Sequence, residues 1–283
     1  NRYRLYVNGI EVASGPARGD LLHWRYETLD IAPHLKAGRN TVAALVWNMG
    51  EYRPAAQISL RTAFVLQGDS PQAAVIDTPR GWKVLASHTW SFARVEGADT
   101  GGFYVAGPRE TIDAAKVPWG WDQPDFDVSG WPDASPIVQQ FASPVALARG
   151  TQANGSAAEW QLVPRNIPPM EQAPIRFANV RRAEGIVVGP GFLLGRDPLV
   201  IPPRSKVTLL LDRGSLTVGY PVLVASGGAG ASATLTYAEG LFDASGNKGN
   251  RNDIAGKTVR GLRDTIRFDG GEKRRFQPLW LRA

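Results

Sequence analysis

The sequence contains no cysteine, and histidine is scarce. A disulfide framework, a thiolate metal site and a cysteine nucleophile are therefore excluded. The three histidines, His23, His34 and His88, are not spaced like HExxH or any other metal-binding pair. The sequence has no GxSxG, P-loop or strand–GxGxxG motif, and no apolar run approaches the roughly 20 residues of a membrane span. These absences argue against the common zinc, nucleotide-binding and triad enzymes, and we expect no membrane partner.

The composition is that of a globular, turn-rich protein. Of 283 residues, 43% are hydrophobic and 20% are charged, which is enough apolar material for one large or two ordinary domains. The 31 glycines and 21 prolines predict many turns and few long helices. The net charge is +6, but acids are interleaved with the bases. A nucleic-acid site would need a basic stripe with aromatic residues for stacking, so we expect no nucleic-acid partner.

An asparagine–glycine pair predicts a hairpin at the start of the chain. Arg2–Val7 alternates, Asn8-Gly9 follows at once, and Ile10–Ala13 would be the return strand. Both turn residues tolerate positive φ, as a two-residue hairpin requires. Further regular structure in this half is predicted at four places: strands at Tyr26–Ile31, Asn40–Trp47 and Gln57–Leu66, and one helical turn at Pro33–Gly38. This order resembles that of galactose-binding-like sandwich domains.

The second half repeats short, turn-marked strand patterns. They lie at Ile186–Val188, Ser205–Leu211, Tyr220–Ala225, Ala233–Glu239 and Asp264–Phe268. Such intervals predict a second antiparallel sandwich. Pro132–Ala158 is loop-like and rich in Ala, Ser and Gly, so we place the domain boundary within it or just after it. The predicted fold class is all-β, with two antiparallel β-sandwich (jelly-roll) domains.

The segment from Gly101 to Trp131 concentrates aromatic and acidic side chains. Trp119-Gly120-Trp121 is the best candidate for binding a ligand, because indole faces stack on the apolar faces of sugar rings. Alternatively, both rings cover the sandwich core. Five acids are close enough in sequence to supply a glycosidase carboxylate pair: Glu110, Asp113, Asp122, Asp125 and Asp127. The simpler interpretation is that Asp125 and Asp127 make hydrogen bonds in turns and that Glu110 pairs with a nearby arginine.

A polar loop in the second half has oxygen-bearing side chains at alternate positions. Asp243, Ser245 and Asn247 begin a segment that loosely resembles a calcium loop. The segment lacks the glycine at its sixth position and the glutamate at its twelfth. The alternating oxygen-bearing side chains make calcium a candidate cofactor. The missing glycine and glutamate favour the alternative, an ordinary polar loop between strands.

Three groups of residues together resemble one protein family. They are Tyr3–Gly9 with Tyr26–Ile31 and Leu35–Asn40; Arg109–Ala114 with Trp121 and Phe126–Trp131; and Leu211–Gly214 with Tyr237–Glu239 and Arg275–Trp280. Their order and spacing resemble the N-terminal, non-catalytic region of bacterial α-L-rhamnosidases of glycoside hydrolase family 78. The sequence departs from the family pattern at Arg109, Val128 and Arg213.

The resemblance implies a domain organisation. Residues 1–160 would form a galactose-binding-like rhamnosidase N-terminal sandwich. Residues 161–283 would form a second, concanavalin-like sandwich, truncated at its C-terminal end. In that family a helical (α/α)6 barrel follows in the same polypeptide and hydrolyses terminal α-L-rhamnosyl residues with inversion. That barrel lies outside this chain, so we assign no catalytic residue here.

The implied function is that of an accessory segment of an α-L-rhamnosidase, with rhamnose-containing glycosides or polysaccharides as partners. Some family members bind rhamnose with calcium in the first sandwich, and Glu110 and Asp113 lie in a matching motif. The candidate sugar-binding residues are therefore Trp119, Trp121, Glu110 and Asp113. The alternatives are a stand-alone, lectin-like carbohydrate-binding module and a purely structural cell-surface domain. The compartment stays open, with a periplasmic or secreted location favoured over the cytoplasm.

Overall fold

A computed structural model describes residues 2–55, 57–58, 60–100, 107–137 and 160–282. Short β-strands, mostly in antiparallel ladders, dominate these residues, and every helix among them is a single turn. This confirms the all-β fold class. No helix in the described part of the chain has the length and apolar character needed to cross a bilayer.

The chain divides into two compact units. Unit 1 comprises Asn1–Arg94 and Val105–Pro168, and unit 2 comprises Val95–Tyr104 and Pro169–Ala283. Unit 1 thus continues beyond residue 160. The assignment of residues 1–160 and 161–283 to two named kinds of sandwich remains a prediction.

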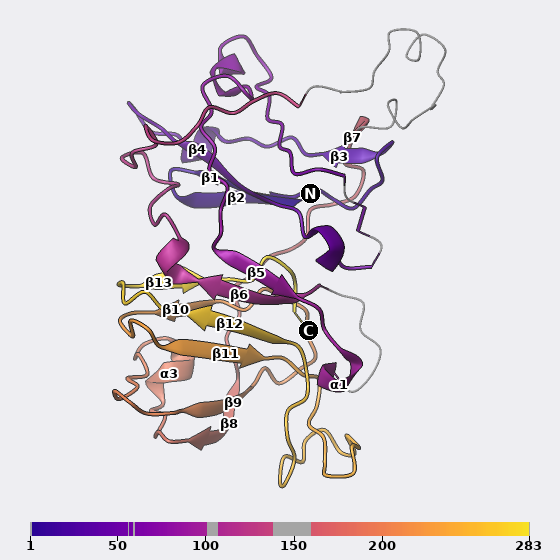
Figure 1. Cartoon of the computed structure of the whole chain (residues 1–283), viewed down its shortest axis with the longest axis vertical. Helices are drawn as coiled ribbons and strands as arrows, with labels where there is room; N and C mark the ends of the chain where they lie inside the picture. The colour runs from indigo at the N-terminus through magenta and orange to yellow at the C-terminus, as the bar shows by residue number, and fades with distance from the viewer. Residues whose placement is uncertain (1, 56, 59, 101–106, 138–159, 283) are drawn as a thin grey trace. The chain divides into compact units, whose positions relative to one another are not determined.

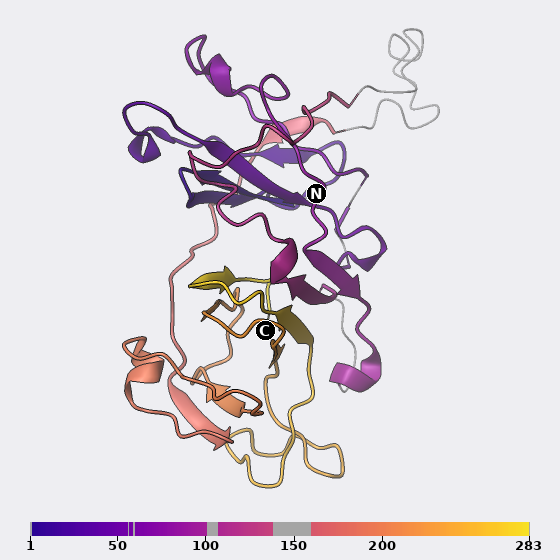
Figure 2. The same cartoon turned by 60° about the vertical axis from the view of Figure 1, so that its left-hand side comes forward.

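Among its described residues, unit 1 holds seven strands and four 3-10 turns. The strands are β1 (Arg2–Val7), β2 (Ile10–Gly15), β3 (Trp24–Tyr26), β4 (Val42–Trp47), β5 (Trp90–Ala93), β6 (Arg109–Asp113) and β7 (Leu162–Pro164). The 3-10 turns are η1 (Ala32–His34), η2 (Gly50–Tyr52), η3 (Ala73–Ile76) and η4 (Ala114–Lys116). β1 pairs antiparallel with both β2 and β4, β5 pairs antiparallel with β6, and β3 pairs in parallel with β7 (Figures 1 and 2).

The β1–β2 hairpin forms as predicted, and its central strand supplies part of the core. Asn8 and Gly9 have φ of 50° and 80°, the conformation of a two-residue hairpin turn. Leu5 and Val7 point to one face of β1 and are 3% and 0% exposed. Burying each side chain stabilises the fold by about 1.5–3 kcal/mol.

The side chain of Asn8 joins three segments of unit 1. Its Nδ2 donates hydrogen bonds to the carbonyl of His34 (2.9 Å) and to Oδ1 of Asn40 (2.8 Å). Its Oδ1 accepts a bond from the backbone N–H of Thr41 (3.0 Å). Asn8 is buried, and both hydrogens of its amide are used. The hairpin turn, η1 and the entry to β4 are therefore held by one amide.

Asn40 continues this network into the predicted helical turn. Its Oδ1 also accepts a bond from the N–H of Lys36 (2.8 Å), and its Nδ2 donates to the carbonyls of Lys36 (2.8 Å) and Gly38 (3.0 Å). Gly38 has φ of +88°, which a side chain would disfavour. The pattern of turn, glycine, asparagine and strand therefore has a physical cause: Asn40 closes the loop that Asn8 anchors.

A carboxylate in the middle of unit 1 ties its first strand to its last segment. Glu27 Oε2 accepts a hydrogen bond from the Tyr3 hydroxyl (2.8 Å), and Oε1 accepts from the N–H of Ala17 (2.9 Å) and from Arg165 Nη1 (3.0 Å). The Glu27 and Arg165 side chains are only 11% and 14% exposed. Because the pair is largely desolvated and each end has further partners, residues up to Arg165 pack as part of unit 1.

Two predicted strands of unit 1 are wrong. In place of the predicted strand Tyr26–Ile31, the structure has the shorter strand β3, which ends at Tyr26. The strand stops there because Glu27 turns inward and because Asp30 Oδ1 accepts a bond from the N–H of Ala32 (2.9 Å), which closes a turn. The described residues of Gln57–Leu66 form no strand. Ile58 and Val65 are 46% and 59% exposed, so the alternation in this range does not correspond to a buried face.

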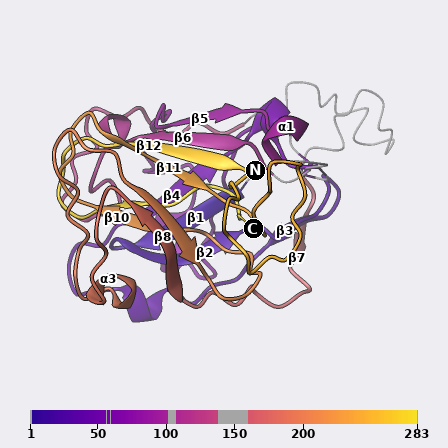
Figure 3. The same ribbon diagram turned by 90° about the horizontal axis from the view of Figure 1, so that it is seen from below.

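Unit 2 contains six strands and two single-turn helices among its described residues. They are α1 (Gly97–Thr100), β8 (Asn179–Glu184), α3 (Gly191–Leu194), β9 (Thr208–Asp212), β10 (Leu223–Ala225), β11 (Ser232–Thr236), β12 (Arg263–Arg267) and β13 (Arg274–Phe276). The antiparallel pairs within this unit are β8–β9, β10–β13 and β11–β12. β11 and β12 lie side by side in Figures 1 and 3.

Four of the five strand patterns predicted for this half coincide with β9 to β12, and Ile186–Val188 is wrong. β8 ends at Glu184, the next residue, Gly185, has φ of +78°, and Val187 is 91% exposed. The glycine turns the chain away before the apolar residues can pair. The core of unit 2 lies instead under β12 and β13, where Ile266 and Phe276 are buried.

A buried ion pair holds the final residues of the chain in unit 2. Arg282 Nε and Nη2 donate to the two carboxylate oxygens of Asp264, at 2.7 and 2.9 Å. The two side chains are 1% and 3% exposed. Removing one partner from such a pair costs about 3–5 kcal/mol, because the other charge is left buried.

The Asn8 network predicts an unusually costly isosteric substitution. Asn8→Asp removes both donated bonds and places a carboxylate against two oxygen atoms, so we expect a loss of about 3 kcal/mol in the free energy of unfolding. Urea denaturation followed by circular dichroism measures it. Asn48→Asp is the matched control, because the Asn48 side chain only accepts a bond, from the N–H of Gly50 (2.9 Å). Equal effects of the two substitutions would contradict the role given to Asn8.

The part-buried hydroxyl of Tyr3 should make the free energy of unfolding fall at alkaline pH. Burial, followed by the charge of Glu27, raises the pKa of the Tyr3 hydroxyl well above its ordinary value of 10.0. Above pH 10 the unfolded chain releases this proton and the folded chain keeps it, so this contribution is complete below pH 10 and falls as the pH rises further. Tyr3→Phe should cost about 1–2 kcal/mol at pH 7. It should also flatten the decline in unfolding free energy above pH 10, whereas Tyr26→Phe, at a residue 44% exposed, should not. An unchanged alkaline slope in Tyr3→Phe would refute this assignment.

Candidate functional site

The predicted tryptophan pair follows β6 and η4 in unit 1. Trp119 Nε1 donates a hydrogen bond to the carbonyl of Ala114 (3.1 Å), and the Trp121 ring packs edge-on against Tyr6 of β1, with centroids 5.4 Å apart. Both tryptophans are half-buried. Gly120 between them has φ of +87°. Trp119 is therefore anchored to η4 and Trp121 to β1, and both residues remain partly exposed.

The two predicted carboxylates of this site point to opposite faces of β6. Glu110 is buried with Ile112, whereas Asp113, three residues beyond Glu110, lies on the other face, because successive strand residues alternate. Asp113 Oδ1 accepts a bond from the N–H of Ala115 (3.3 Å), and Lys116 Nζ lies 3.4 Å from Oδ2. Asp113 therefore caps η4, next to the Trp119 anchor, and the structure does not bring Glu110 and Asp113 together.

Several aromatic and acidic residues after Trp121 pack against each other or stabilise turns. Phe126 and Trp131 form an edge-on pair with centroids 5.7 Å apart. Asp127 Oδ1 accepts a bond from the N–H of Ser129 (2.8 Å), and this bond lowers the pKa of the Asp127 carboxyl below its ordinary value. Asp127 thus has the turn-capping role considered from the sequence.

The predicted calcium loop is organised around a turn at Asp243. Asp243 Oδ1 accepts a bond from the N–H of Asn247 (2.9 Å), and its backbone pairs with the same residue. Ser245 and Asn247 are exposed. No cluster of three or more acidic or histidine side chains suited to a metal ion occurs among the residues that the structure describes.

A lysine supplies a positive charge to the same loop. Lys257 Nζ donates to the carbonyls of Lys248 and Asn250, both at 2.9 Å, and lies 3.9 Å from a carboxylate oxygen of Asp253. The Lys257 side chain is 8% exposed. Two carbonyls of the predicted calcium segment are thus already bound to a cation of the chain itself. The predicted metal ligands, Asp243, Ser245 and Asn247, are not part of this arrangement.

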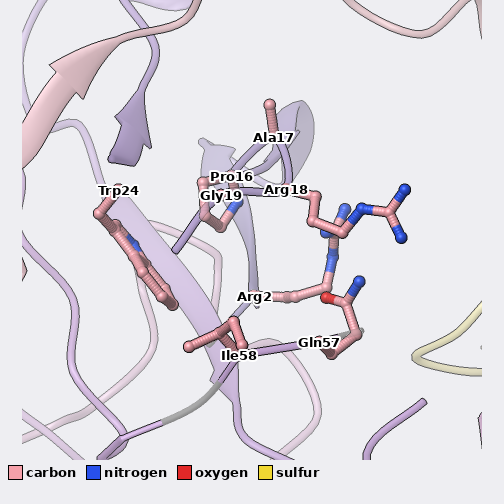
Figure 4. A pocket seen from close by; sticks show the side chains of 8 residues that line it. All are labelled: Arg2, Pro16, Ala17, Arg18, Gly19, Trp24, Gln57 and Ile58. Carbon is pink, nitrogen blue, oxygen red and sulfur yellow. The ribbon is translucent and has the colours of Figure 1, made fainter. Parts of the chain in front are cut away.

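Sequence reasoning missed a shallow pocket in unit 1. It is lined by Arg2, Pro16, Ala17, Arg18, Gly19, Trp24, Gln57 and Ile58 (Figure 4). These residues come from β1, the loop after β2, the start of β3 and the segment before residue 60. No local pattern in the sequence links these four places, and the parallel β3–β7 pair that helps to position Trp24 joins residues far apart in the chain.

Comparisons with known proteins point to one family. A family model described as the alpha-L-rhamnosidase N-terminal domain matches residues 2–171. An alpha-L-rhamnosidase of Streptomyces avermitilis is 27% identical over 145 residues, which are 51% of this chain and 11% of that relative.

Two solved structures resemble the chain. A GH78 family rhamnosidase of Bacillus sp. GL1 aligns with a TM-score of 0.49 and 24% identity, over 64% of this chain and 17% of that chain. Streptomyces avermitilis alpha-L-rhamnosidase complexed with L-rhamnose aligns with a TM-score of 0.46 and 18% identity, over 99% and 24%. The chain thus spans a small part of the length of these relatives. Because the family model covers more than half of its residues, the chain belongs to the α-L-rhamnosidase N-terminal domain family.

Proposed function

We propose that this chain is the accessory segment of a longer polypeptide that hydrolyses terminal α-L-rhamnosyl residues with inversion. A helical (α/α)6 barrel in the same polypeptide would carry the catalysis, and rhamnose-containing glycosides or polysaccharides would be its substrates. The family match over residues 2–171 is the observation that carries this proposal. The relative from Streptomyces avermitilis, itself an alpha-L-rhamnosidase, supports the activity proposed for the parent.

The placement of the acids supports an accessory role. Inverting hydrolysis uses two carboxyl groups that face each other across the sugar, about 6.5–9.5 Å apart. In unit 1, Glu110 is buried on one face of β6 and Asp113 caps η4 on the other. Asp127 is committed to a turn. We therefore assign none of these residues to catalysis.

The accessory role that we propose includes sugar contact at the tryptophan pair. Trp119 and Trp121 are held by Ala114 and Tyr6, so a sugar ring stacking on them would meet side chains that are already ordered. Asp113 is the carboxylate at the same end of β6 as the indoles and would accept bonds from sugar hydroxyls. Glu110, on the other face, would act only by fixing the strand.

The test is a titration of the 283-residue chain with L-rhamnose, followed by tryptophan fluorescence, with calcium and with a chelator. Because the site offers little more than stacking on exposed rings, we expect a saturable change in the millimolar range, which corresponds to about 4 kcal/mol of binding free energy. Trp121→Ala should abolish the change, and Trp121→Phe, which preserves packing on Tyr6, should weaken it. A chelator that removes the response would show that calcium takes part.

Trp131→Phe is the matched control, since Trp131 packs on Phe126 and is given no sugar contact. It should leave the response intact. Absence of any response to rhamnose at tens of millimolar, or a response that survives in Trp121→Ala, would overturn the proposed sugar contact.

A further inference from the structure

We propose that the shallow pocket beside β3 is a second saccharide subsite, selective for a sugar that carries a carboxylate. The proposal rests on the proposed function only in taking a glycan as the ligand. It uses none of the tryptophans of the Trp119–Trp121 pair. Its evidence is the composition of the pocket, the rigidity of its walls and the charge around it.

The two sides of the pocket differ in chemistry. Figure 4 shows the polar ends of Arg2, Arg18 and Gln57 gathered on one side, while Trp24 and Ile58 lie on the other. An indole face beside hydrogen-bond donors matches a pyranose ring, which has an apolar face and a rim of oxygen atoms. The enclosed space has room for about one water molecule, so a ligand would lie across the mouth of the pocket.

Trp24 is held in place by its neighbours. Its backbone N–H donates to the carbonyl of Gln161 (2.9 Å), and its strand pairs in parallel with β7. Its ring packs edge-on against Trp160, with centroids 6.3 Å apart. Binding at this ring would therefore require little ordering of the protein.

The loop that carries Arg18 is also fixed. The N–H of Ala17 donates to Glu27, and a side chain at Gly19 would clash with the carbonyl oxygen of His23. The Arg18 side chain itself is exposed, and it forms no ion pair or hydrogen bond with any residue that the structure describes. A rigid backbone thus presents a guanidinium group that has no counter-ion among those residues.

The charge around the pocket favours an anion. Its lining residues include two arginines and no acid. The acids in the adjacent loops are engaged elsewhere: Asp20 accepts bonds from the N–H groups of Leu22 (2.8 Å) and His23 (2.9 Å), and Glu27 binds Arg165. A guanidinium group binds a carboxylate through two parallel, charge-assisted hydrogen bonds, which are stronger than bonds to the uncharged hydroxyls of a neutral sugar. A uronate-type residue offers a carboxylate to Arg18, oxygen atoms to the amide of Gln57 and an apolar face to the indole of Trp24.

The test compares sugars that differ only in the carboxylate. The 283-residue chain is titrated with D-glucuronate and D-glucose, and binding is followed by the indole N–H signals in ¹H–¹⁵N NMR spectra. We expect glucuronate to bind about tenfold more tightly, with Trp24 as the responding signal, and 0.5 M NaCl to reduce the difference. Equal affinity for the two sugars overturns the proposal.

Arg18→Gln should reduce the preference for glucuronate to about threefold or less, whereas Arg39→Gln, the same change at an exposed arginine outside the pocket, should preserve it. Equal effects of the two variants overturn the assignment. A tetraglutamate peptide that binds as tightly as glucuronate would show an acidic-peptide site instead. Trp121→Ala should leave the glucuronate preference unchanged, which separates this outcome from that of the rhamnose titration.

Discussion

The amide of Asn8 makes three hydrogen bonds inside unit 1, to His34, Asn40 and Thr41. A hairpin turn needs only positive φ at this position, which glycine or aspartate can also supply. What requires asparagine is the simultaneous need for two donors and one acceptor in a buried place. The amide thereby fixes where β1 ends and where β4 begins, and β1 is the middle strand of its sheet. Tyr6 of that strand in turn supports Trp121, so the geometry of the candidate sugar site depends on the same anchor.

Three of the positive charges in this protein are buried against partners within the fold. Arg282 is buried against Asp264, Arg165 against Glu27, and Lys257 against carbonyls of its own loop. Because each ion pair removes one acid as well as one base, these contacts leave the net charge of +6 to the remaining side chains. They also single out Arg18, whose guanidinium group lies at a pocket without such an internal partner among the described residues. Charge that is not neutralised within the fold is available for recognition.

The sequence predicted the elements that depend on local rules. Asn8-Gly9 fixed the hairpin, and Gly38 with Asn40 fixed the turn before β4, because these residues act on their own neighbourhood. Alternation alone failed at Gln57–Leu66, since a strand also needs a partner, and no local signal says whether one exists. At Tyr26–Ile31 the failure has a long-range cause: Glu27 is turned inward by Tyr3 and Arg165, residues at opposite ends of unit 1.

In the candidate site, too, features set by neighbouring residues could be predicted from the sequence and features built from distant segments could not. The family resemblance drawn from scattered motifs agrees with the family match. The tryptophan pair is anchored by Ala114 and Tyr6, and its contact with a sugar stays a prediction. Glu110 and Asp113 lie on opposite faces of β6 because side chains alternate along a strand. This separation can be deduced from the sequence only once the segment is known to be a strand. The pocket at Trp24 could not be predicted, because four distant segments build it.

We propose that this chain contributes recognition and support while catalysis lies elsewhere in a longer polypeptide. The most direct measurement is the hydrolysis of an aryl α-L-rhamnoside by the purified 283-residue chain, beside the complete polypeptide that contains it. We expect turnover with inversion for the complete polypeptide and none for the chain alone. Turnover by the 283 residues alone, abolished by substitution of one of their own carboxylates, would contradict it.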